Sequence, residues 1–509
     1  MSADPARQAP GDDDASTPGG IPTQWRRLDA RMLLIHPFQA LVRFLPALLA
    51  IFIARSSTDP LDRWELLAVP VVMALGAVSW FTTRYRIGGG QLVLRRGLLN
   101  RTTSTAPLDR VRTVDLTAQL HHRALGLAKV EISTAGSSHE RLVLDSLRLD
   151  EGRRLREELL HRAGLGASAL PPPQGVPVDV GLGHPGGDEV LLRLDPAWLR
   201  YAPLTGTGLV AAAALFGFVG QGWNAFGEEE EILLEGARQV RDVGPLVAVL
   251  GALALVTALS VVAYALTFWG FRLTRNDRGS LHVSRGLLTT RETSIDHGRL
   301  RGVDVAEPLG LRLAGAARLK AVTTGLTHEG QGGSDWLAPP APGSTVTAVA
   351  RTIVRDDAAI TAGLTQHGPV ARRRRHTRAL APAGVASAGI VLAQLWWDLP
   401  ALLLLAVPLL LVAAGALGWD RASGLGHLVT PRHLVTREGS LDRHRVVLDR
   451  AGIIGWRVER TFFQSRAGVV TLVATTAAGR QRYRLLDLEP EVAYAVIAEV
   501  SPGLLAEFS

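Results

Sequence analysis

The segment Leu92-Val-Leu-Arg-Arg-Gly97-Leu-Leu occurs again as Leu281-His-Val-Ser-Arg-Gly286-Leu-Leu and, in diverged form, as His433-Leu-Val-Thr-Arg-Glu-Gly439-Ser-Leu. In each copy a second glycine follows the first by 29 positions, and these second glycines are Gly126, Gly315 and Gly468. Apolar and polar residues alternate around the glycines, which predicts antiparallel strands joined by tight turns. A turn that needs a positive φ angle explains the glycines without any ligand. We therefore expect three copies of one unit, with equivalent turns at these glycines.

Two apolar runs precede each copy, at residues 38–54 and 64–81, 203–222 and 243–269, and 380–397 and 399–419. Each run is close to the ~20 residues that span ~30 Å of hydrocarbon, and several carry tryptophan at an end, where the bilayer interface favours it. The alternative is buried helices of a large soluble protein, but the runs lack the polar face of a surface helix. The fold class expected is membrane α-helical plus α+β. Six transmembrane helices form three hairpins, and each hairpin is followed by a cytoplasmic β-domain closed by a C-terminal helix.

Composition excludes several kinds of chemistry. The chain has 509 residues, 47% of them hydrophobic, and its mean hydropathy is +0.17, which is high for a soluble enzyme. It has no cysteine, so disulfides, thiolate metal sites, cysteine nucleophiles and lipidated cysteines are all excluded. The net charge of +8 is carried almost wholly by arginine. The first residues are polar and lack the pattern of a signal peptide, so we expect a disordered tail and a first hairpin that is retained.

Arginine placement predicts the orientation. Arg84 and Arg86 follow the first hairpin, Arg272 follows the second, and the run 372–375 precedes the third, whereas the turn of the second hairpin holds four consecutive glutamates at 228–231. By the positive-inside rule, both termini and all three β-domains are expected in the cytoplasm of a multi-pass plasma-membrane protein. The basic run lies beside a span, so we interpret it as a topology signal and anionic-lipid contact rather than a nucleic-acid site.

The expected domain order is a disordered tail (1–24), hairpin 1 (25–82), domain 1 (83–163), a linker (164–199), hairpin 2 (200–270), domain 2 (271–367), a basic linker (368–378), hairpin 3 (379–420) and domain 3 (421–509). Helical patterns at 150–162, 356–365 and 489–500 are the expected closing helices. An Ala/Pro/Gly-rich stretch at about 330–343 is interpreted as an insertion in domain 2.

The segments LVLRRGLL (92–99), PLDRVRTVD (107–115) and RALGLAKVEI (123–132) resemble the second type of bacterial pleckstrin-homology-like (PH-like) domain, as found in membrane proteins of the YdbT kind. The resemblance extends from about residue 26 to 500. It implies that each domain is a seven-stranded PH-like sheet closed by a helix, and it implies no catalytic activity. Copy 2 departs from the pattern at Gly298, which replaces an aspartate. In copy 3 the Asp449-Arg450 pair comes two residues early.

No catalytic motif is found. The sequence contains no Gly-x-Ser-x-Gly elbow, His-Glu-x-x-His pair, phosphate-binding Gly-x-x-x-x-Gly-Lys loop or calcium loop. We expect His121 and His122 to lie on the surface, because neighbours on a strand point to opposite faces. Arg43 is expected to reach the cytoplasmic headgroups from its span. We therefore expect a non-enzymatic protein with no cofactor and no metal.

The function expected is a membrane scaffold whose PH-like domains bind lipid headgroups, peptides or proteins, in envelope maintenance or stress resistance. Arginine suits phosphate and carboxylate, and the candidate contacts are Arg95, Arg96, Arg110, Arg112, Arg285, Arg299 and Arg301. Solvated surface charge is the alternative for each of them. Partners expected are the bilayer and an anionic lipid or a membrane protein, but no nucleic acid. A transporter or export factor for a peptide or lipid is the alternative function, although the spans hold few polar residues.

Overall fold

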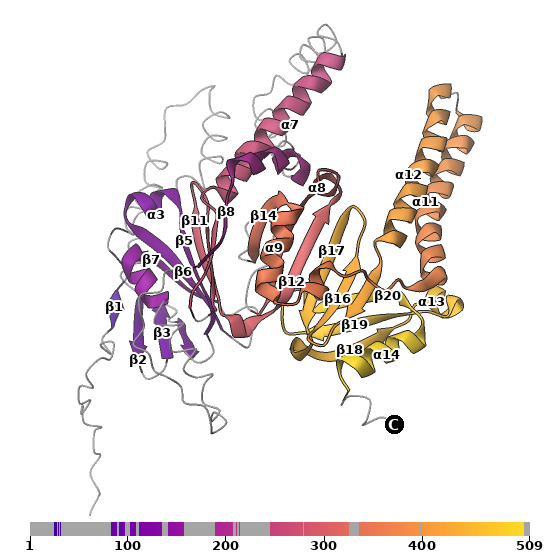
Figure 1. Ribbon diagram of the computed structural model, residues 1–509. Helices are drawn as coiled ribbons and strands as arrows, with labels where there is room; N and C mark the ends of the chain where they lie inside the picture. Colours follow the sequence, from indigo (N-terminus) through magenta and orange to yellow (C-terminus); the bar gives the residue numbers. More distant parts are fainter. Residues whose placement is uncertain are drawn as a thin grey trace, which may run out of the picture.

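The computed structural model describes residues 25–27, 29, 31, 83–88, 91–96, 102–107, 111–134, 141–156, 189–206, 210, 213, 245–277, 279–324, 335–397 and 400–502. Strands from the three copies form a row of sheets, and long helices leave the row on one side (Figure 1).

Each copy contains two sets of three strands. In copy 1 they are β2 (Arg84–Gly88), β3 (Gln91–Arg96) and β4 (Thr102–Pro107), then β5 (Val111–Ala118), β6 (Leu127–Thr134) and β7 (Arg141–Arg148). In copy 2 they are β9 (Arg272–Arg275), β10 (Leu281–Arg285) and β11 (Thr290–Ile295), then β12 (Leu300–Pro308), β13 (Ala316–Thr323) and β14 (Trp336–Pro342). In copy 3 they are β15 (Gly426–Val429), β16 (His433–Glu438) and β17 (Asp442–Asp449), then β18 (Ile453–Glu459), β19 (Val470–Thr476) and β20 (Arg482–Leu488).

The sheets join the copies to one another. The second set of copy 1 and the first set of copy 2 form one seven-stranded sheet, β7-β6-β5-β11-β10-β9-β8, in which β8 is Glu189–Arg193. The second set of copy 2 and the first set of copy 3 form a six-stranded sheet, β14-β13-β12-β17-β16-β15. We call the β5–β11 contact the first joint and the β12–β17 contact the second joint. The seven-stranded sheet therefore spans two copies, where the resemblance had implied one such sheet per domain.

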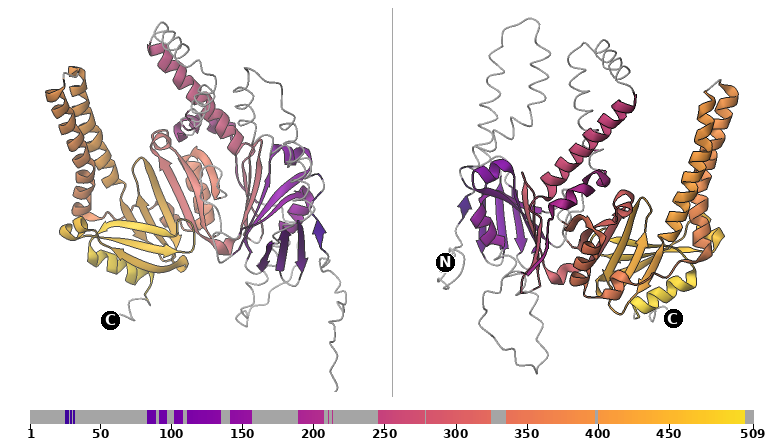
Figure 2. Two further views of the ribbon diagram at one scale, coloured as in Figure 1. Left: turned by 180° about the vertical axis from the view of Figure 1, so that it is seen from behind. Right: turned by 45° about the horizontal axis from the view of Figure 1, so that its top comes forward.

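The two outer sets form smaller sheets. The first set of copy 1 forms the four-stranded sheet β1-β2-β3-β4, in which β1 is Arg26–Arg27, and the second set of copy 3 forms the three-stranded sheet β18-β19-β20. Figure 2 shows these two sheets at opposite ends of the row.

The glycine turns confirm the repeat. Gly126, Gly315 and Gly468 have φ angles of 69°, 66° and 67°, and Gly286 and Gly439 have φ angles of 109° and 99°. A Cβ at Gly286 would lie 2.0 Å from a backbone oxygen, so this turn excludes any side chain. Gly97 lies outside the described residues.

Among the described residues, three helices are long and apolar enough to cross a membrane, over Val249–Phe268, Gly368–Trp396 and Ala401–Ser423. They belong to α7 (Pro245–Phe268), α11 (Gly368–Trp396), and the short 3₁₀ helix η4 (Ala401–Leu405) with α12 (Ala406–Ser423). Helix α11 ends at Trp396 and η4 begins at Ala401, which agrees with the separate apolar runs expected at 380–397 and 399–419. Runs 38–54 and 64–81 lie outside the described residues, as does most of 203–222.

Three expected boundaries are wrong. Pro203 does not begin a span, because it lies inside the 3₁₀ helix η2 (Pro196–Thr205), which ends at Gly206 with φ 72°. Residues 368–378 are not a linker but the first turns of α11. The closing helix of copy 2 is α9 (Gly343–Val354), and the expected helix at 356–365 is only the short α10 (Asp357–Thr361).

The stretch taken for an insertion holds the last strand of copy 2, β14, despite its three prolines. This is possible because β14 is an edge strand of its sheet, where a missing N–H costs no ladder bond. The α9 helix then starts where the Gly343 N–H donates to the Gly315 carbonyl, just as Leu149 donates to Gly126 in copy 1. In copy 3, α14 (Pro490–Val500) closes the domain as expected.

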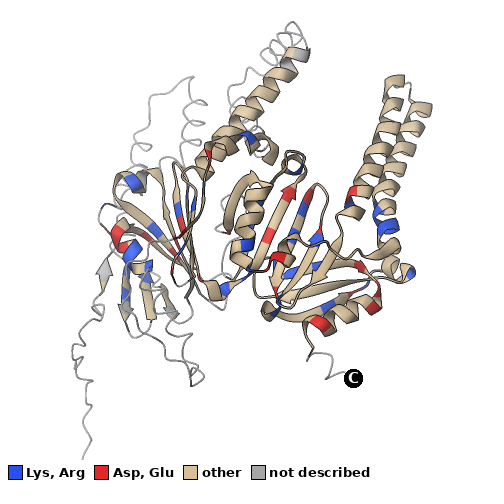
Figure 3. Ribbon diagram, viewed as in Figure 1, with Lys and Arg blue, Asp and Glu red and all other residues tan. Residues whose placement is uncertain are grey.

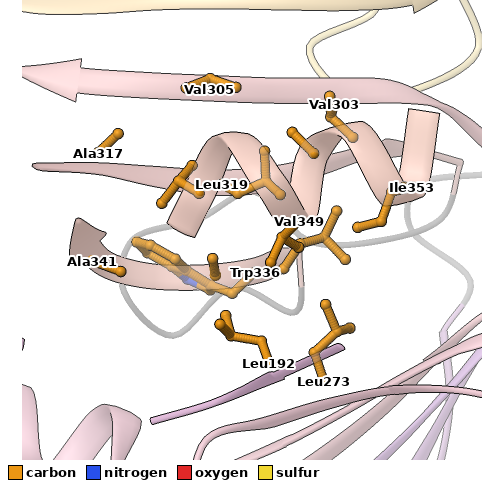
Figure 4. Packing of buried hydrophobic residues seen from close by; sticks show 14 of the residues in the cluster. Leu192, Leu273, Val303, Val305, Ala317, Leu319, Trp336, Ala341, Val349 and Ile353 are labelled. Carbon is orange, nitrogen blue, oxygen red and sulfur yellow. The ribbon is translucent and has the colours of Figure 1, made fainter. Parts of the chain in front are cut away.

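The largest core lies in copy 2, where α9 covers the second strand set (Figure 4). Trp336 from β14 is 2% exposed and packs edge-on against Phe268 at the end of α7, with ring centroids 5.0 Å apart. Leu192 and Leu273 extend this core to the seven-stranded sheet. One apolar core therefore joins both sheets of copy 2 to the base of α7.

Candidate functional site

One end of the strands meets the candidate membrane helices. The Gly286 N–H donates to the Trp269 carbonyl just beyond α7, at 2.9 Å. Short helices α3 (Leu120–Ala124), α8 (Leu309–Leu313) and α13 (Phe462–Ala467) connect the first two strands of each second set. They carry exposed apolar side chains, including Leu313, Phe462 and Phe463 at 80%, 75% and 71% exposure. Figure 1 shows α8 near the base of α7 and α13 beside the start of α11.

Three of the predicted arginines lie on the strands that lead to this end, Arg95 and Arg96 in β3 and Arg285 in β10. Arg95 is exposed and its guanidinium lies 4.5 Å from the centroid of the Trp25 ring. Arg285 is 5% exposed, between the rings of Phe268 and Trp336 at 5.5 and 5.9 Å. Burial and the neighbouring Arg291 lower the pKa of Arg285 to about 10. Arg285 is therefore part of the packing beneath α7 rather than an open ligand contact.

The other described pair of predicted arginines lies at the opposite end of β12. This strand starts after the 3₁₀ turn η3 (His297–Arg299) and ends at α8, so its nine residues separate the two ends by roughly 30 Å. Arg299 lies 3.8 Å from Asp296, and Arg301 lies 4.0 Å from Asp449 of copy 3. The seven predicted arginines therefore do not form one surface. Residue Arg110 and the side chains of Arg96 and Arg112 lie outside the described residues.

A hollow of about 300 Å³ opens between copies 2 and 3 at this far end. Three arginines line it, Arg301, Arg355 and Arg432, together with a single carboxylate, that of Asp449. Within the described part of the chain, the exposed guanidinium groups of Arg355 and Arg432 have no ion-pair partner. The Asp449 carboxylate is partly engaged, since it accepts a 3.0 Å bond from the Ala451 N–H.

A buried polar cluster supports one wall of the hollow. The Nδ1 atom of His433 lies 2.8 Å from Asp356 Oδ2, and the Thr430 hydroxyl donates to the same oxygen at 2.7 Å. Although burial alone would raise the pKa of Asp356, hydrogen bonds from His433, Thr430 and the Ala359 N–H lower it. Asp356 directly follows Arg355, so this cluster fixes the backbone from which the Arg355 side chain extends.

Sequence reasoning missed Arg355 and Arg432. They lie 77 positions apart in different copies, and no motif links them. Sequence reasoning also aligned the Asp449-Arg450 pair with the Asp-Arg pair of segment 107–115 in copy 1. Asp449 caps the 3₁₀ turn η5 (Arg450–Gly452) as Asp296 caps η3, so Asp449 is equivalent to Asp296.

The basic run of α11 divides into two pairs. Arg374 and Arg375 are 12% exposed and both bind Asp487, which is fully buried, with Arg374 at 3.2 Å. Gln464 of α13 also donates to Asp487, at 2.9 Å. This network ties α11 to the sheet of copy 3, and the other two arginines of the run are exposed.

The expectation for the histidine pair is wrong for His122. It lies on α3 rather than on a strand, is 2% exposed, and its Nε2 is 3.4 Å from Asp145. The side chain of His121 is not among those described. Among the described residues, no group of three or more His, Cys, Asp or Glu could hold a metal ion. Arg43 and the glutamates at 228–231 lie outside the described residues.

The model of the bacterial PH domain family matches residues 37–163, 216–353 and 382–501, which together are well over half of the chain. The chain belongs to the bacterial PH domain family. Each match begins within or just before an apolar run and continues through the strands, so the repeating unit of this bacterial PH protein includes apolar sequence as well as the strands. No curated protein and no solved structure matches the chain.

Proposed function

We propose that this bacterial PH protein is a non-enzymatic, membrane-anchored scaffold that binds an anionic group of a soluble partner in the hollow at its second joint. The anchor is supported by α7, α11 and α12, which are nearly free of charge along their apolar lengths and leave the sheets on one side (Figure 3). The exposed apolar tips of α8 and α13 favour contact with the bilayer interface at the same end. The arginine bias supports cytoplasmic sheets, and a plasma-membrane location is part of the proposal.

The observation that carries the proposal is the pair of guanidinium groups of Arg355 and Arg432, which have no ion-pair partner among the described residues and lie beside Arg301. Three arginines against one aspartate give the hollow an excess positive charge, and planar guanidinium groups bind phosphate or carboxylate in bidentate fashion. The hollow lies at the end of β12 that faces away from α7, so a headgroup of the anchoring bilayer is the less favoured ligand. A phosphate or carboxylate group on a soluble molecule fits this position.

Calorimetric titration of the full-length protein in detergent with inorganic pyrophosphate tests the site. We expect binding that weakens with salt, and at least a tenfold loss of affinity in R301Q/R355Q/R432Q. The matched control is R193Q/R373Q/R466Q, which removes the same charge at exposed positions elsewhere and should bind as the wild type does. Equal losses in both variants, or no loss in the first, would contradict the proposed site.

A further inference from the structure

Two strands of the described sheets have a neighbour on one side only and sit where the chain elsewhere forms a joint. They are β4, the last strand of the four-stranded sheet, and β18, the first strand of the three-stranded sheet. Thr102 to Thr105 are exposed on β4, and Ile454 and Val458 are 67% and 41% exposed on β18. An edge with open backbone groups and apolar side chains is a template for another strand.

The repeat shows which strand fits each edge. By the equivalent glycines, β4 corresponds to β11 and β17, and β18 corresponds to β5 and β12. Both joints pair these equivalent strands antiparallel, β5 with β11 and β12 with β17. The registers are also identical: Thr290 lies opposite Ala118 in the first joint, and the equivalent residue Arg443 lies opposite Glu307 in the second.

Equivalent residues are buried inside the joints but exposed on the edges of β4 and β18. Val305 of β12 is 8% exposed inside the second joint, whereas its equivalent Val458 on β18 is 41% exposed. Ser294 of β11 is fully buried, whereas its equivalent Thr105 on β4 is exposed. The two edges therefore carry the surface of a joint without its partner strand.

We propose that β18 of one chain pairs antiparallel with β4 of a second copy of this chain, in the register of the two joints within the chain. Thr102 then lies opposite Glu459, and Thr105 lies opposite Trp456. Pro107 falls just beyond the paired positions, because its equivalents Asp296 and Asp449 are unpaired in the existing joints. Its missing N–H therefore removes no ladder bond.

The membrane helices are compatible with this contact. The existing joints keep α7 and the α11–α12 hairpin on one side of the row (Figures 1 and 2), so a third joint of the same geometry keeps the helices of both chains on that side. The contact is head-to-tail, which produces a row or a closed ring of chains in the membrane plane. This inference does not depend on the anion site.

The joint between chains is weaker than the joints within a chain. In the first joint the Arg123 guanidinium donates to the Leu287 carbonyl at 2.6 Å, and the equivalent Arg312 donates to Ser440 at 3.2 Å. Copy 3 has Ser465 at this position. The contact between chains therefore rests on strand pairing, and we expect it to depend on protein concentration in the membrane.

Cysteine cross-linking in native membranes tests the register, because the wild-type chain has no cysteine. Directly opposed residues of antiparallel strands have Cα atoms about 4.5–5.5 Å apart, within disulfide range. We expect T102C/E459C to form covalent dimers and larger species on oxidation. The positive control is T117C/R291C, which places the same pair in the first joint and should cross-link within one chain. The negative control is T102C/R482C, whose second cysteine lies on the exposed start of β20.

Mixing two tagged chains separates specific from random contact. A T102C chain with an E459C chain should give only mixed dimers, and adding Val458→Lys to the latter should reduce their yield at least fivefold. Oxidation of T117C/R291C without any T102C/E459C product would overturn the proposal. So would equal cross-linking in T102C/R482C, or a β18 edge cross-linked to a different protein.

Discussion

The first and second joints have one backbone register but different lengths. Five residue pairs form the first joint, from Thr290–Ala118 to Ser294–Val114, and seven form the second, from Gly302–Leu448 to Pro308–Asp442. Gly302 adopts φ 153°, and a Cβ there would lie 2.0 Å from the Val447 carbonyl oxygen. The equivalent residue in the first joint is Thr113, where no pairing is seen. One glycine therefore accounts for the closer approach of the strands at that end of the second joint.

The joints also differ in their polar contacts. In the first, Glu292 of β11 binds Arg153 and Arg156 of helix 149–156, both at 2.9 Å and partly exposed to solvent. In the second, His444 of β17 lies 2.9 Å from Asp304 of β12, which is 8% exposed. The same backbone pairing thus accommodates an ion-pair network with one largely exposed member, Arg153 at 47%, in the first joint and a pair with both side chains mostly buried in the second. The backbone and the turns therefore determine the register of each joint, and the side chains determine its stability.

The largest effect is expected at Gly302. Gly302→Ala should destabilise the second joint by about 3 kcal/mol or more, because the new methyl group meets backbone rather than a mobile side chain. Hydrogen exchange of β12 and β17 in the full-length protein should rise, while β5 and β11 stay protected. Gly455→Ala is the control, because Gly455 is the equivalent position on β18 and nothing lies within 4 Å of a Cβ built there. Its free energy of unfolding should change by less than about 1 kcal/mol. Equal effects would refute the role of Gly302.

The next effect is a pH dependence confined to the second joint. Burial lowers the pKa of His444, but hydrogen bonds to Asp304 and Asp442 outweigh it and raise the pKa to about 9, even with Arg480 nearby. Because the pKa of His444 is higher in the folded state than in the unfolded state, protonation of His444 stabilises the folded state. This stabilisation is complete below the unfolded pKa of 6.5 and is lost as the pH rises through about 9. We expect the melting temperature to fall between pH 6.5 and 9.5, with at most about 3 kcal/mol involved.

His444→Gln should remove this pH dependence without altering the first joint. His367 and His427 do not contribute in this window, because burial lowers the pKa of both, that of His367 to about 4. A variant that retains the wild-type pH profile would show that another group is responsible.

The smallest effect is expected in the first joint. Glu292→Gln should cost about 1 kcal/mol, because Glu292 is 17% exposed while one of its partners, Arg153, is 47% exposed. Chemical unfolding of the full-length protein, followed by exchange at β11, measures it. The control Glu189→Gln removes a pair with Arg275 in which Glu189 is 57% exposed, and should change stability by less than about 0.5 kcal/mol. A loss comparable to that of Gly302→Ala would mean that the two joints do not differ in strength as inferred.

Much of each copy could be predicted because its signals are local. Alternating residues such as 91–95 and 129–133 are strands, and the paired glycines are equivalent turns with positive φ angles. The errors arose where context overrides local preference. Prolines pointed away from a strand at 336–342, yet β14 is an edge strand, and the charges of 372–375 hid a helix whose arginines bind a buried carboxylate.

The candidate site shows the same limit. Arg301 was recognised because it repeats within a motif, but Arg355 and Arg432 belong to no motif and meet only when β12 pairs with β17. Arg285 looked like a ligand contact by its repeat position, and packing against Phe268 and Trp336 removed it from solvent. Proximity between residues far apart in the chain has no local sequence signal.

By itself the sequence determined the three copies, their strand-forming segments, the turn glycines and the apolar helices, because periodicity and backbone preference act over a few residues. The tertiary structure alone decided that strands pair between copies, that two sheets each draw on two copies, and that Arg301, Arg355 and Arg432 meet in a hollow at the second joint. The reason is physical: an open strand edge is satisfied by whichever strand folding brings beside it, and its hydrogen bonds are made by backbone groups that every residue carries.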